Sequence, residues 1–378
     1  MKTSVYKFTD DQWMMHSVSR PVDETRVRLV ICFSGKSGLN APDLYPQLHK
    51  KFPAAHIAFC STAGEIFHEN VLDHSQILVA MEPEQTAIRA ASVNIRDFQN
   101  SFDAAVHLGG QLQGDGLAYI LILSDGSLVN GSELVKGFNT VVPQVLVTGG
   151  LAGDGPDFRS TLVGLDGTPE EGKIVAIGFY GSKLLVTHGS QAGWNMFGVE
   201  KEITKSAGNI LYEIDHENAL ERYKNYLGPD ADDLPGSALL FPLAVTESGS
   251  DLPVVRTILS IDEKNSSMTF AGDVPEGSKV RFMRTNLDTL TGAAAQAASY
   301  AMEGNRKPDF ALLIRCVGRK LVLGPRIEQE VEAVSETLGG DVPLAGFYSY
   351  GEISPFNESG KCQFHNQTMT ITAFYELS

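Results

Sequence analysis

The sequence predicts an α/β protein whose mixed sheets are flanked by helices and whose two related halves consist of repeated strand-turn-helix-strand units. Three stretches share apolar residues, then small residues, then a glycine beside a carboxylate, namely residues 58–66, 146–154 and 344–353. Each pattern is typical of a buried strand that ends in a glycine turn. An apolar run begins roughly 30 residues before each stretch, the length of a strand–helix–strand unit. We therefore expect the functional turns at strand C-termini.

Length and composition limit the class of protein. The chain has 378 residues, 43% of them hydrophobic, which is enough for two domains or one large duplicated domain. A formal net charge of -16 argues against nucleic acid and anionic membranes as partners. No apolar run approaches the roughly 18 residues of a membrane span, and the first 20 residues lack the apolar core of a signal peptide. The four cysteines form no CxxC pair, so we expect a reduced, cytoplasmic protein.

The N-terminal part begins with polar residues 1–26, which we interpret as an N-terminal arm or a first strand. Val27–Phe33 is a near-continuous apolar run, typical of a strand that is covered on both faces. Leu44, Leu48 and Phe52 follow at helical spacing behind a proline, so they predict a helix.

The second unit is predicted from similar signals. Ser101 and Ser132 are suitable N-caps for two helices, and the apolar run 119–123 precedes the second of them. Gly181-Ser182 separates two apolar runs and predicts a two-residue hairpin, from which residues 188–194 leave as a loop.

The C-terminal part begins after a predicted boundary. Residues 209–227 have helical spacing of apolar residues and end at a Gly-Pro pair. The Pro- and Asp-rich residues 228–235 then predict a boundary between a domain over 27–228 and a domain over 236–378. An alanine-rich helix is expected over 288–302, before the third unit.

Several strings, in their order along the chain, resemble the FIST family, in both its N-terminal and its C-terminal parts. They are residues 60–66, 149–154, 211–215, 270–277, 316–319, 346–353 and 365–370. The resemblance covers residues 27–376. It implies a sensory domain that binds small ligands, for which amino acids have been proposed. Some bacterial members are similar to haem-binding nitric-oxide sensors, which implies a separate histidine kinase or cyclic-di-GMP enzyme as the partner, and a homodimer is left open.

The third unit carries our first candidate ligand site. Arg319 follows a strand end, Tyr348 and Tyr350 flank the turn, and Glu352 comes next. A guanidinium and a carboxylate that converge at strand C-termini can hold a zwitterion such as an amino acid. The alternative is a structural ion pair between Arg319 and Glu352. The candidate set also includes Cys316, His365 and Asn366.

His188 is the leading candidate ligand for the iron of a b-type haem. Trp194 and Phe197 follow it and could supply an apolar wall for the porphyrin. A b-type haem needs only an axial side chain and an apolar slot, so the sequence holds almost no positive signature for it. An ordinary hydrogen-bonding histidine is the alternative, and His365 is the second candidate ligand.

An enzyme would need a nucleophile and a base. Cys316, His365 and Glu352 are the one set that offers thiol, imidazole and carboxylate. Cys316 ends an apolar run, where a thiol is usually buried and inert, so we expect no enzyme. The glycines at 149, 150, 153 and 155 could cradle an anion, but tight turns at strand ends explain them better.

Overall fold

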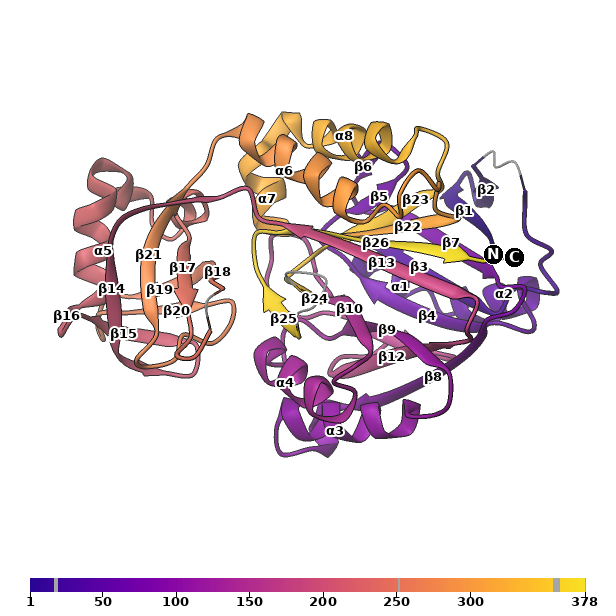
Figure 1. The fold of residues 1–378 in the computed structure, drawn as a ribbon, viewed down its shortest axis with the longest axis horizontal. Helices are drawn as coiled ribbons and strands as arrows, with labels where there is room; N and C mark the ends of the chain where they lie inside the picture. The colour runs from indigo at the N-terminus through magenta and orange to yellow at the C-terminus, as the bar shows by residue number, and fades with distance from the viewer. Residues whose placement is uncertain (17–19, 251, 356–360, 378) are drawn as a thin grey trace.

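The computed structural model describes residues 1–16, 20–250, 252–355 and 361–377. They form a large body of three six-stranded sheets and a small domain, which lies at the left of Figure 1. The α/β class and the mixed sheets flanked by helices are confirmed.

The three sheets of the body are named A, B and C. Sheet A has the strand order β11 (Val163–Leu165), β4 (His56–Ser61), β3 (Leu29–Ser34), β7 (Gln76–Glu82), β1 (Lys2–Thr9), β2 (Gln12–Met15). Sheet B has the order β13 (Leu184–Gln191), β26 (Met369–Glu376), β22 (Phe310–Cys316), β23 (Leu344–Ser349), β5 (Glu65–Phe67), β6 (Asn70–Leu72). Sheet C has the order β25 (Cys362–His365), β24 (Gly351–Pro355), β10 (Leu146–Leu151), β9 (Leu117–Ser124), β12 (Lys173–Tyr180), β8 (Ala87–Asn94).

Each sheet is built from one repeat unit by the same rule. A parallel pair forms its centre: β3 and β4 in sheet A, β9 and β10 in sheet C, β22 and β23 in sheet B. On one side of each central pair, an antiparallel strand pairs with the first strand. On the other side, a strand from a different unit pairs with the second strand. Thus β11, β24 and β5 pass from their own units into sheets A, C and B. The three units predicted from the repeated pattern are therefore arranged in a ring.

One central core joins the three sheets. Phe33 of sheet A stacks on Phe347 of sheet B with 5.0 Å between ring centroids, and Phe179 of sheet C packs on Phe374 of sheet B. Because one face of each sheet is buried in this core and the other under helices, the central strands are apolar on both faces.

Helices cover the outer faces of the sheets. In Figure 1, α3 and α4 lie along one side of the body, below sheet C, and α6 to α8 lie along the opposite side, above sheet B. The helices of the body are α1 (Lys36–Leu39), α2 (Leu44–Lys51), α3 (Ser101–Leu112), α4 (Gly131–Val141), α6 (Leu287–Tyr300), α7 (Val317–Leu323) and α8 (Glu328–Leu338), with the 3-10 turns η1 (Ile95–Asp97) and η4 (Gly324–Arg326).

The small domain lies between β13 and α6 in the chain. Its sheet has the order β18 (Val254–Arg256), β17 (Leu243–Thr246), β21 (Lys279–Arg284), β14 (Asn195–Ala207), β15 (Ile210–Ile214), β20 (Ser267–Phe270), β19 (Ile258–Asp262), with β16 (Glu217–Asn218) beside β15. Helix α5 (Ala219–Leu227) and the turns η2 (Gly228–Asp233) and η3 (Gly236–Leu240) pack on it.

Several sequence-based boundaries differ from the structure. Of the two alternatives for the N-terminal residues, the first strand is correct rather than the arm, because β1 and β2 form one side of sheet A. The predicted boundary at 228–235 lies inside the small domain, within η2 and its exit. The expected hairpin around Gly181 is absent from the described residues, because β12 and β13 pair in different sheets. The helix expected over 209–227 is β15 followed by α5.

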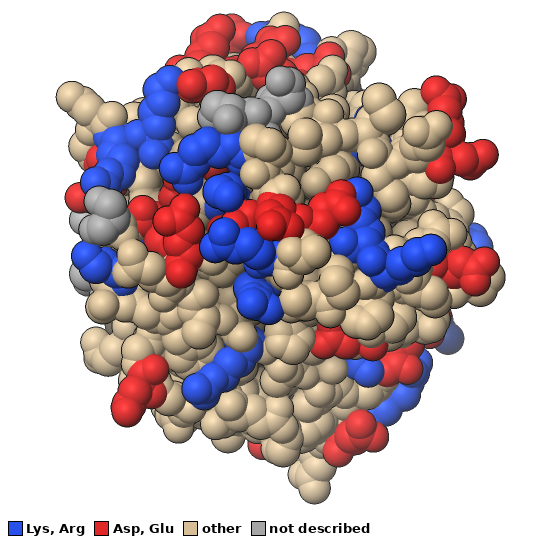
Figure 2. Space-filling view, turned by 90° about the vertical axis from the view of Figure 1, so that its right-hand side faces the viewer, with Lys and Arg blue, Asp and Glu red and all other residues tan. Residues whose placement is uncertain are grey.

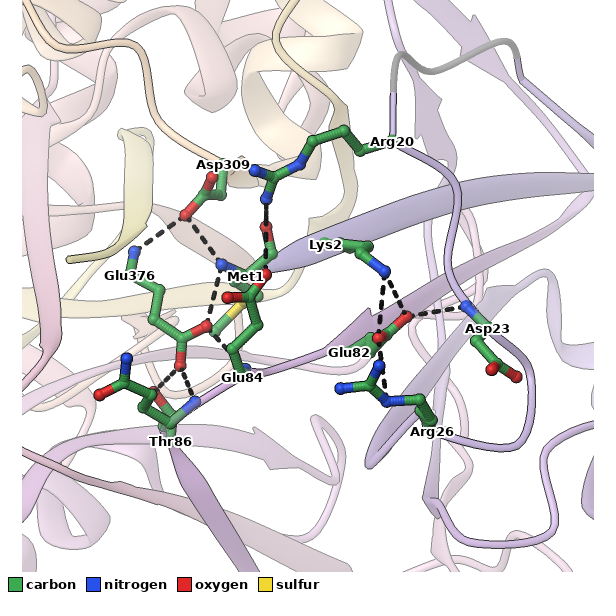
Figure 3. Close-up of polar contacts among 11 residues, drawn as sticks. Met1, Lys2, Arg20, Asp23, Arg26, Glu82, Glu84, Thr86, Asp309 and Glu376 are labelled. Carbon is green, nitrogen blue, oxygen red and sulfur yellow. Dashed lines mark hydrogen bonds and ion pairs between the residues drawn. The ribbon is translucent and has the colours of Figure 1, made fainter. Parts of the chain in front are cut away.

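Ion pairs fix the N-terminal strand. The Met1 ammonium lies 3.4 Å from Asp309 and 2.9 Å from Glu376. Figure 3 draws these contacts. Burial by itself would raise the pKa of Glu376. Hydrogen bonds from Glu84, Met1 and others outweigh this effect and lower the pKa from 4.5 to about 2. Figure 2 looks onto this end of the body, where Lys and Arg side chains lie beside Asp and Glu rather than in patches of one sign.

Candidate functional site

The three carboxylate-bearing turns meet at one end of the body. We call residues 61–65, 151–154 and 349–352 the corner turns. Three backbone hydrogen bonds join them in a ring: Ala63 N to Tyr348 O at 2.9 Å, Gly153 N to Ser61 O at 2.9 Å, and Tyr350 N to Leu151 O at 3.1 Å. The repeated pattern therefore marks three equivalent positions, each with its own surroundings.

The third corner turn is buried. Glu352 accepts hydrogen bonds from Ser349 Oγ at 2.7 Å and from Thr368 Oγ1 at 2.8 Å. Burial raises the pKa of Glu352 to about 7, although these hydrogen bonds and the nearby Arg319 lower it in part. Its side chain is fully buried, so it does not face a solvent-open pocket.

Arg319 is equally buried and has a partner that the sequence did not indicate. Its guanidinium and that of Arg315 both pair with Glu330 on α8, and all three side chains are 0% exposed. Arg319 also donates to the backbone oxygens of Ala192, Gln367 and Leu290. The structure therefore makes Arg319 part of a structural ion group, but with Glu330 rather than with Glu352.

The remaining residues predicted for this site are packed in the same way. Tyr348 lies beneath the Arg315 guanidinium, 4.9 Å from it, and Asn366 is fully buried. Burial, together with the Glu352 carboxylate, raises the pKa of the Cys316 thiol to about 12, so this thiol is a poor nucleophile. His365 bonds the Ser354 carbonyl at 3.0 Å, and burial lowers its pKa to about 4.

Tyr350 is the predicted residue that reaches a cavity. A cavity of about 440 Å³ lies between the body and the small domain, and we call it the interdomain cavity. The body contributes residues 126–131, Leu151, Phe158, Arg159, Tyr350 and Phe364, and the small domain contributes Asn209, Leu259, Phe270, Ala271 and Gly272. Its size is typical of small-molecule sites, roughly 300–1,000 Å³.

Tyr350 also forms part of the cavity wall through its hydroxyl. This hydroxyl donates to Asp154 and accepts from the backbone N–H groups of Asp154 and Phe158, both at 3.1 Å. The Phe158 ring stacks on Tyr350 with 4.5 Å between centroids. These contacts hold the loop after β10 against the third corner turn.

A second cavity, whose lining has more charged residues, lies beside the first corner turn. It has about 290 Å³ and is lined by residues 35–37, 62–65, Asp73, His74, Asp154, Gly155, Asp157, Arg159 and Ser160. This cavity lies beside the turns that follow β3 and β4, just as the interdomain cavity lies beside the turns that follow β9 and β10. At the third equivalent position, Lys320 bonds Ala63 O at 2.9 Å and Gln367 lies against Gly318. Two of the three positions are open, and side chains fill the third.

The three residues predicted to hold haem do not meet around a slot. His188 lies within β13 rather than on a loop, and it is 9% exposed. Trp194 donates to Gln367 O at 3.2 Å and packs with Leu290 and Leu323, whereas Phe197 packs against Tyr226 of the small domain. Five cavities lie among the described residues, the two named above included. Neither His188 nor Trp194 nor Phe197 lines any of these five. The structure therefore does not bring His188, Trp194 and Phe197 together around one of these cavities. No group of three or more His, Cys, Asp or Glu side chains that could hold a metal ion occurs in the described part of the chain.

The fold is that of a two-part α/β protein with a cavity of small-molecule size between its parts, near the C-termini of central strands. The model of the FIST N domain matches residues 28–217, and that of the FIST C domain matches residues 219–355. The chain belongs to the FIST family. FIST domains are sensory domains of signalling proteins that bind small ligands.

The relatives are uncharacterized proteins. Rv0628c of Mycobacterium tuberculosis is 24% identical over 269 residues, which is 68% of each chain. Mb0898c of Mycobacterium bovis is 23% identical over 290 residues, which is 74% of this chain and 73% of the relative. Among solved structures, a cyanuric acid hydrolase from A. caulinodans covers 100% of this chain and 99% of its own, at 8% identity and a TM-score of 0.34, too distant to carry an argument.

Sequence reasoning missed most of the cavity lining. Phe158 and Arg159 follow the second corner turn, and Leu259 and Phe270 belong to the small domain. The Gly149–Gly155 stretch, interpreted as tight turns, was the available signal, because the loop that it begins carries Phe158 and Arg159. No pattern in the sequence indicated that the small domain folds back onto this loop.

Proposed function

We propose that this chain is a small-ligand sensory protein whose ligand binds in the interdomain cavity. The observation that carries the proposal is that both domains line the cavity beside the corner turns. A ligand that contacts both domains binds one of their relative positions more tightly than another, and this difference shifts the population. The surface offered to a partner then changes with it.

Polar contacts join the two domains beside this cavity. Away from its lining, one apolar cluster also contains Met283 of the small domain together with Leu290 and Leu323 of the body. Arg256 of the small domain donates to Phe364 O at 2.9 Å, and Asn130 of the body donates to Asp273 at 3.1 Å. Gln367 donates to Leu239 O at 3.2 Å. Contacts of this kind can be rearranged by a ligand that fills the adjoining cavity.

The partner in this proposal is a separate histidine kinase or cyclic-di-GMP enzyme, as the family resemblance implies. The protein acts without catalysis of its own, alone or as a homodimer. No helix in the described part of the chain has the length and apolar character needed to cross a membrane.

A thermal-shift screen with small metabolites, amino acids included, tests the proposal. A ligand at about 100 times its dissociation constant adds about 2.7 kcal/mol of stability. Ala271→Trp places a large ring in the cavity, so we expect it to abolish the shift. Ala87→Trp, at an exposed position of β8, is the matched control and retains the shift. A shift that survives in Ala271→Trp would place the ligand elsewhere.

Haem binding stays a prediction of the family resemblance. If haem bound to this chain, His188 would be the residue that holds its iron, and the iron would supply a site for nitric oxide. Protein expressed with haem precursor tests this through its absorption spectrum. A Soret band that is lost in His188→Ala and retained in His365→Ala would support the sequence-based assignment.

A further inference from the structure

The mouth of the interdomain cavity is apolar and open to solvent. Leu128, Phe158 and Leu259 are 48%, 44% and 44% exposed, and all three line the cavity. They come from the loop before α4, from the loop after β10 and from the small domain. An apolar ligand body would remove this surface from water, which is favourable.

Aromatic rings form much of the wall. The stacked Phe158–Tyr350 pair has an interplanar angle of 17°, and Phe270 and Phe364 add rings from the small domain and from β25. Flat rings pack well against such a surface, because stacked and edge-to-face contacts add to the burial of area. The lining therefore favours a planar ligand body.

Arg159 is the one charged residue in the described lining of this cavity. Its guanidinium makes no hydrogen bond or ion pair with the described residues, although its backbone N–H bonds Asp154 at 3.0 Å. Three carboxylates near this cavity have other partners: Asp154 is held by Tyr350, Asp125 by Ser127 and Leu128, and Asp273 by Asn130 and Lys136. Arg159 also lines the second cavity, where Asp157 belongs to the same lining.

The N-terminus of α4, which also lines the cavity, adds little to this charge. The side chain of Asn130 already accepts hydrogen bonds from the N–H groups of Ser132 and Glu133, at 2.9 and 3.1 Å. The N–H of Gly126 is bound to Thr161 Oγ1 at 2.8 Å. Arg159 is thus the side chain that would meet an acidic group of a ligand.

We propose that the ligand of the interdomain cavity is an aromatic monoanion, with its ring among Phe158, Tyr350 and Phe364 and its carboxylate on Arg159. This inference rests on the proposed function and specifies the ligand class. A guanidinium suits a carboxylate because it presents paired N–H donors in one plane.

Isothermal titration calorimetry of the full chain tests the class with matched probes. The probes are phenylacetate, its neutral amide phenylacetamide, the cation phenethylamine, and acetate, which lacks the ring. We expect phenylacetate to bind roughly tenfold more tightly than phenylacetamide, the effect of one charged hydrogen bond. Phenethylamine and acetate should bind more weakly than phenylacetate.

Two variants separate the role of Arg159 from a general charge effect. Arg159→Gln should bring phenylacetate to the affinity of phenylacetamide. Arg306→Gln removes an exposed arginine outside the lining and should leave both affinities unchanged. Added salt should weaken phenylacetate more than phenylacetamide, because the Arg159 contact is exposed.

The outcomes distinguish this inference from the proposed function. If phenylacetamide or phenethylamine binds as tightly as phenylacetate, the inference that the ligand is an anion is wrong. If acetate binds as tightly as phenylacetate, the inference that the ligand needs an aromatic ring is wrong. Absence of phenylacetate binding would overturn the class. In each of these cases a metabolite shift that Ala271→Trp abolishes would still uphold the cavity as a sensory site.

Discussion

At the scale of single residues, the third corner turn is held together by buried charge. Arg315 and Arg319 share the carboxylate of Glu330, and burial lowers the pKa of Arg319 to about 9, with the neighbouring Arg315 adding to this effect. Desolvation penalises each charge, so the group is stable only while the opposite charges remain together.

Removing one member of this group should therefore be severe. We expect Glu330→Gln to destabilise the protein by about 3–5 kcal/mol, because two buried guanidinium groups lose their counter-ion. Glu332→Gln, an exposed carboxylate on the same helix, should change the stability by less than about 0.5 kcal/mol. The midpoint of urea denaturation measures both, and equal midpoints for the two variants would contradict the assignment.

Glu352 should make stability depend on pH. Its pKa is raised from 4.5 to about 7 by burial, so the folded state holds the proton more tightly than the unfolded state. Its contribution is therefore complete below about pH 4.5 and is lost as the pH rises through about 7.

Glu352→Gln mimics the protonated side chain and isolates this effect. The stability of the wild type minus that of the variant should fall between about pH 5 and about pH 8, by at most roughly 1.4 kcal/mol per unit. Denaturant midpoints across this range measure the difference. A difference that is flat with pH would contradict the raised pKa of Glu352.

At the scale of elements, glycines decide how closely helices and strands approach. Gly137 of α4 faces α3, where an added Cβ would lie 2.6 Å from the Ala105 Cβ and from the Phe102 carbonyl oxygen. Gly110 of α3 is exposed, and an added Cβ would meet nothing within 4 Å. The same substitution should therefore have opposite effects at the two sites.

We expect Gly110→Ala to stabilise the protein by about 0.5–1 kcal/mol, because alanine has the higher helix propensity. Gly137→Ala should destabilise it by about 1–3 kcal/mol, because the two helices must move apart. Thermal unfolding of the two variants beside the wild type measures both. Stabilisation by Gly137→Ala would show that α3 and α4 are packed less closely.

At the scale of the whole molecule, three units surround one core, and the small domain lies beside one end of this body (Figure 1). Arg256 of the small domain is one link between the two parts: it is 2% exposed and donates to Phe364 O of the body at 2.9 Å, and to Asp273 O of its own domain at 2.9 Å. It lies beside the interdomain cavity, so its contacts and ligand binding should be coupled.

Arg256→Met keeps the length of the side chain and removes its donors. We expect the contact between the domains to weaken by about 1.5–3 kcal/mol. Calorimetry should then resolve an earlier unfolding transition of the small domain. Lys279→Met, an exposed position of the same domain, should leave the profile unchanged. A single unshifted transition in Arg256→Met would show that other contacts hold the domains together.

The sequence by itself determined the repeat units and their corner turns. Apolar runs that end in small-residue turns predicted β3, β9 and β22, and apolar runs followed by Gly-Glu or Gly-Asp predicted β4, β10 and β23. Local patterns of burial and turn residues are visible along the chain. The alanine-rich helix α6 was predicted for the same reason. The family resemblance is confirmed over residues 28–217 and 219–355.

Only the tertiary structure decided which corner turn meets a cavity. Arg319, Glu352 and Cys316 had the same local pattern as exposed site residues, yet α8 brings Glu330 onto Arg319. Lys320 and Gln367 fill the position beside the third corner turn. Tyr350 reaches a cavity because the small domain, distant in the chain, folds back beside it. Burial and pairing depend on long-range contacts, and the local sequence pattern does not encode which distant side chain will cover a turn.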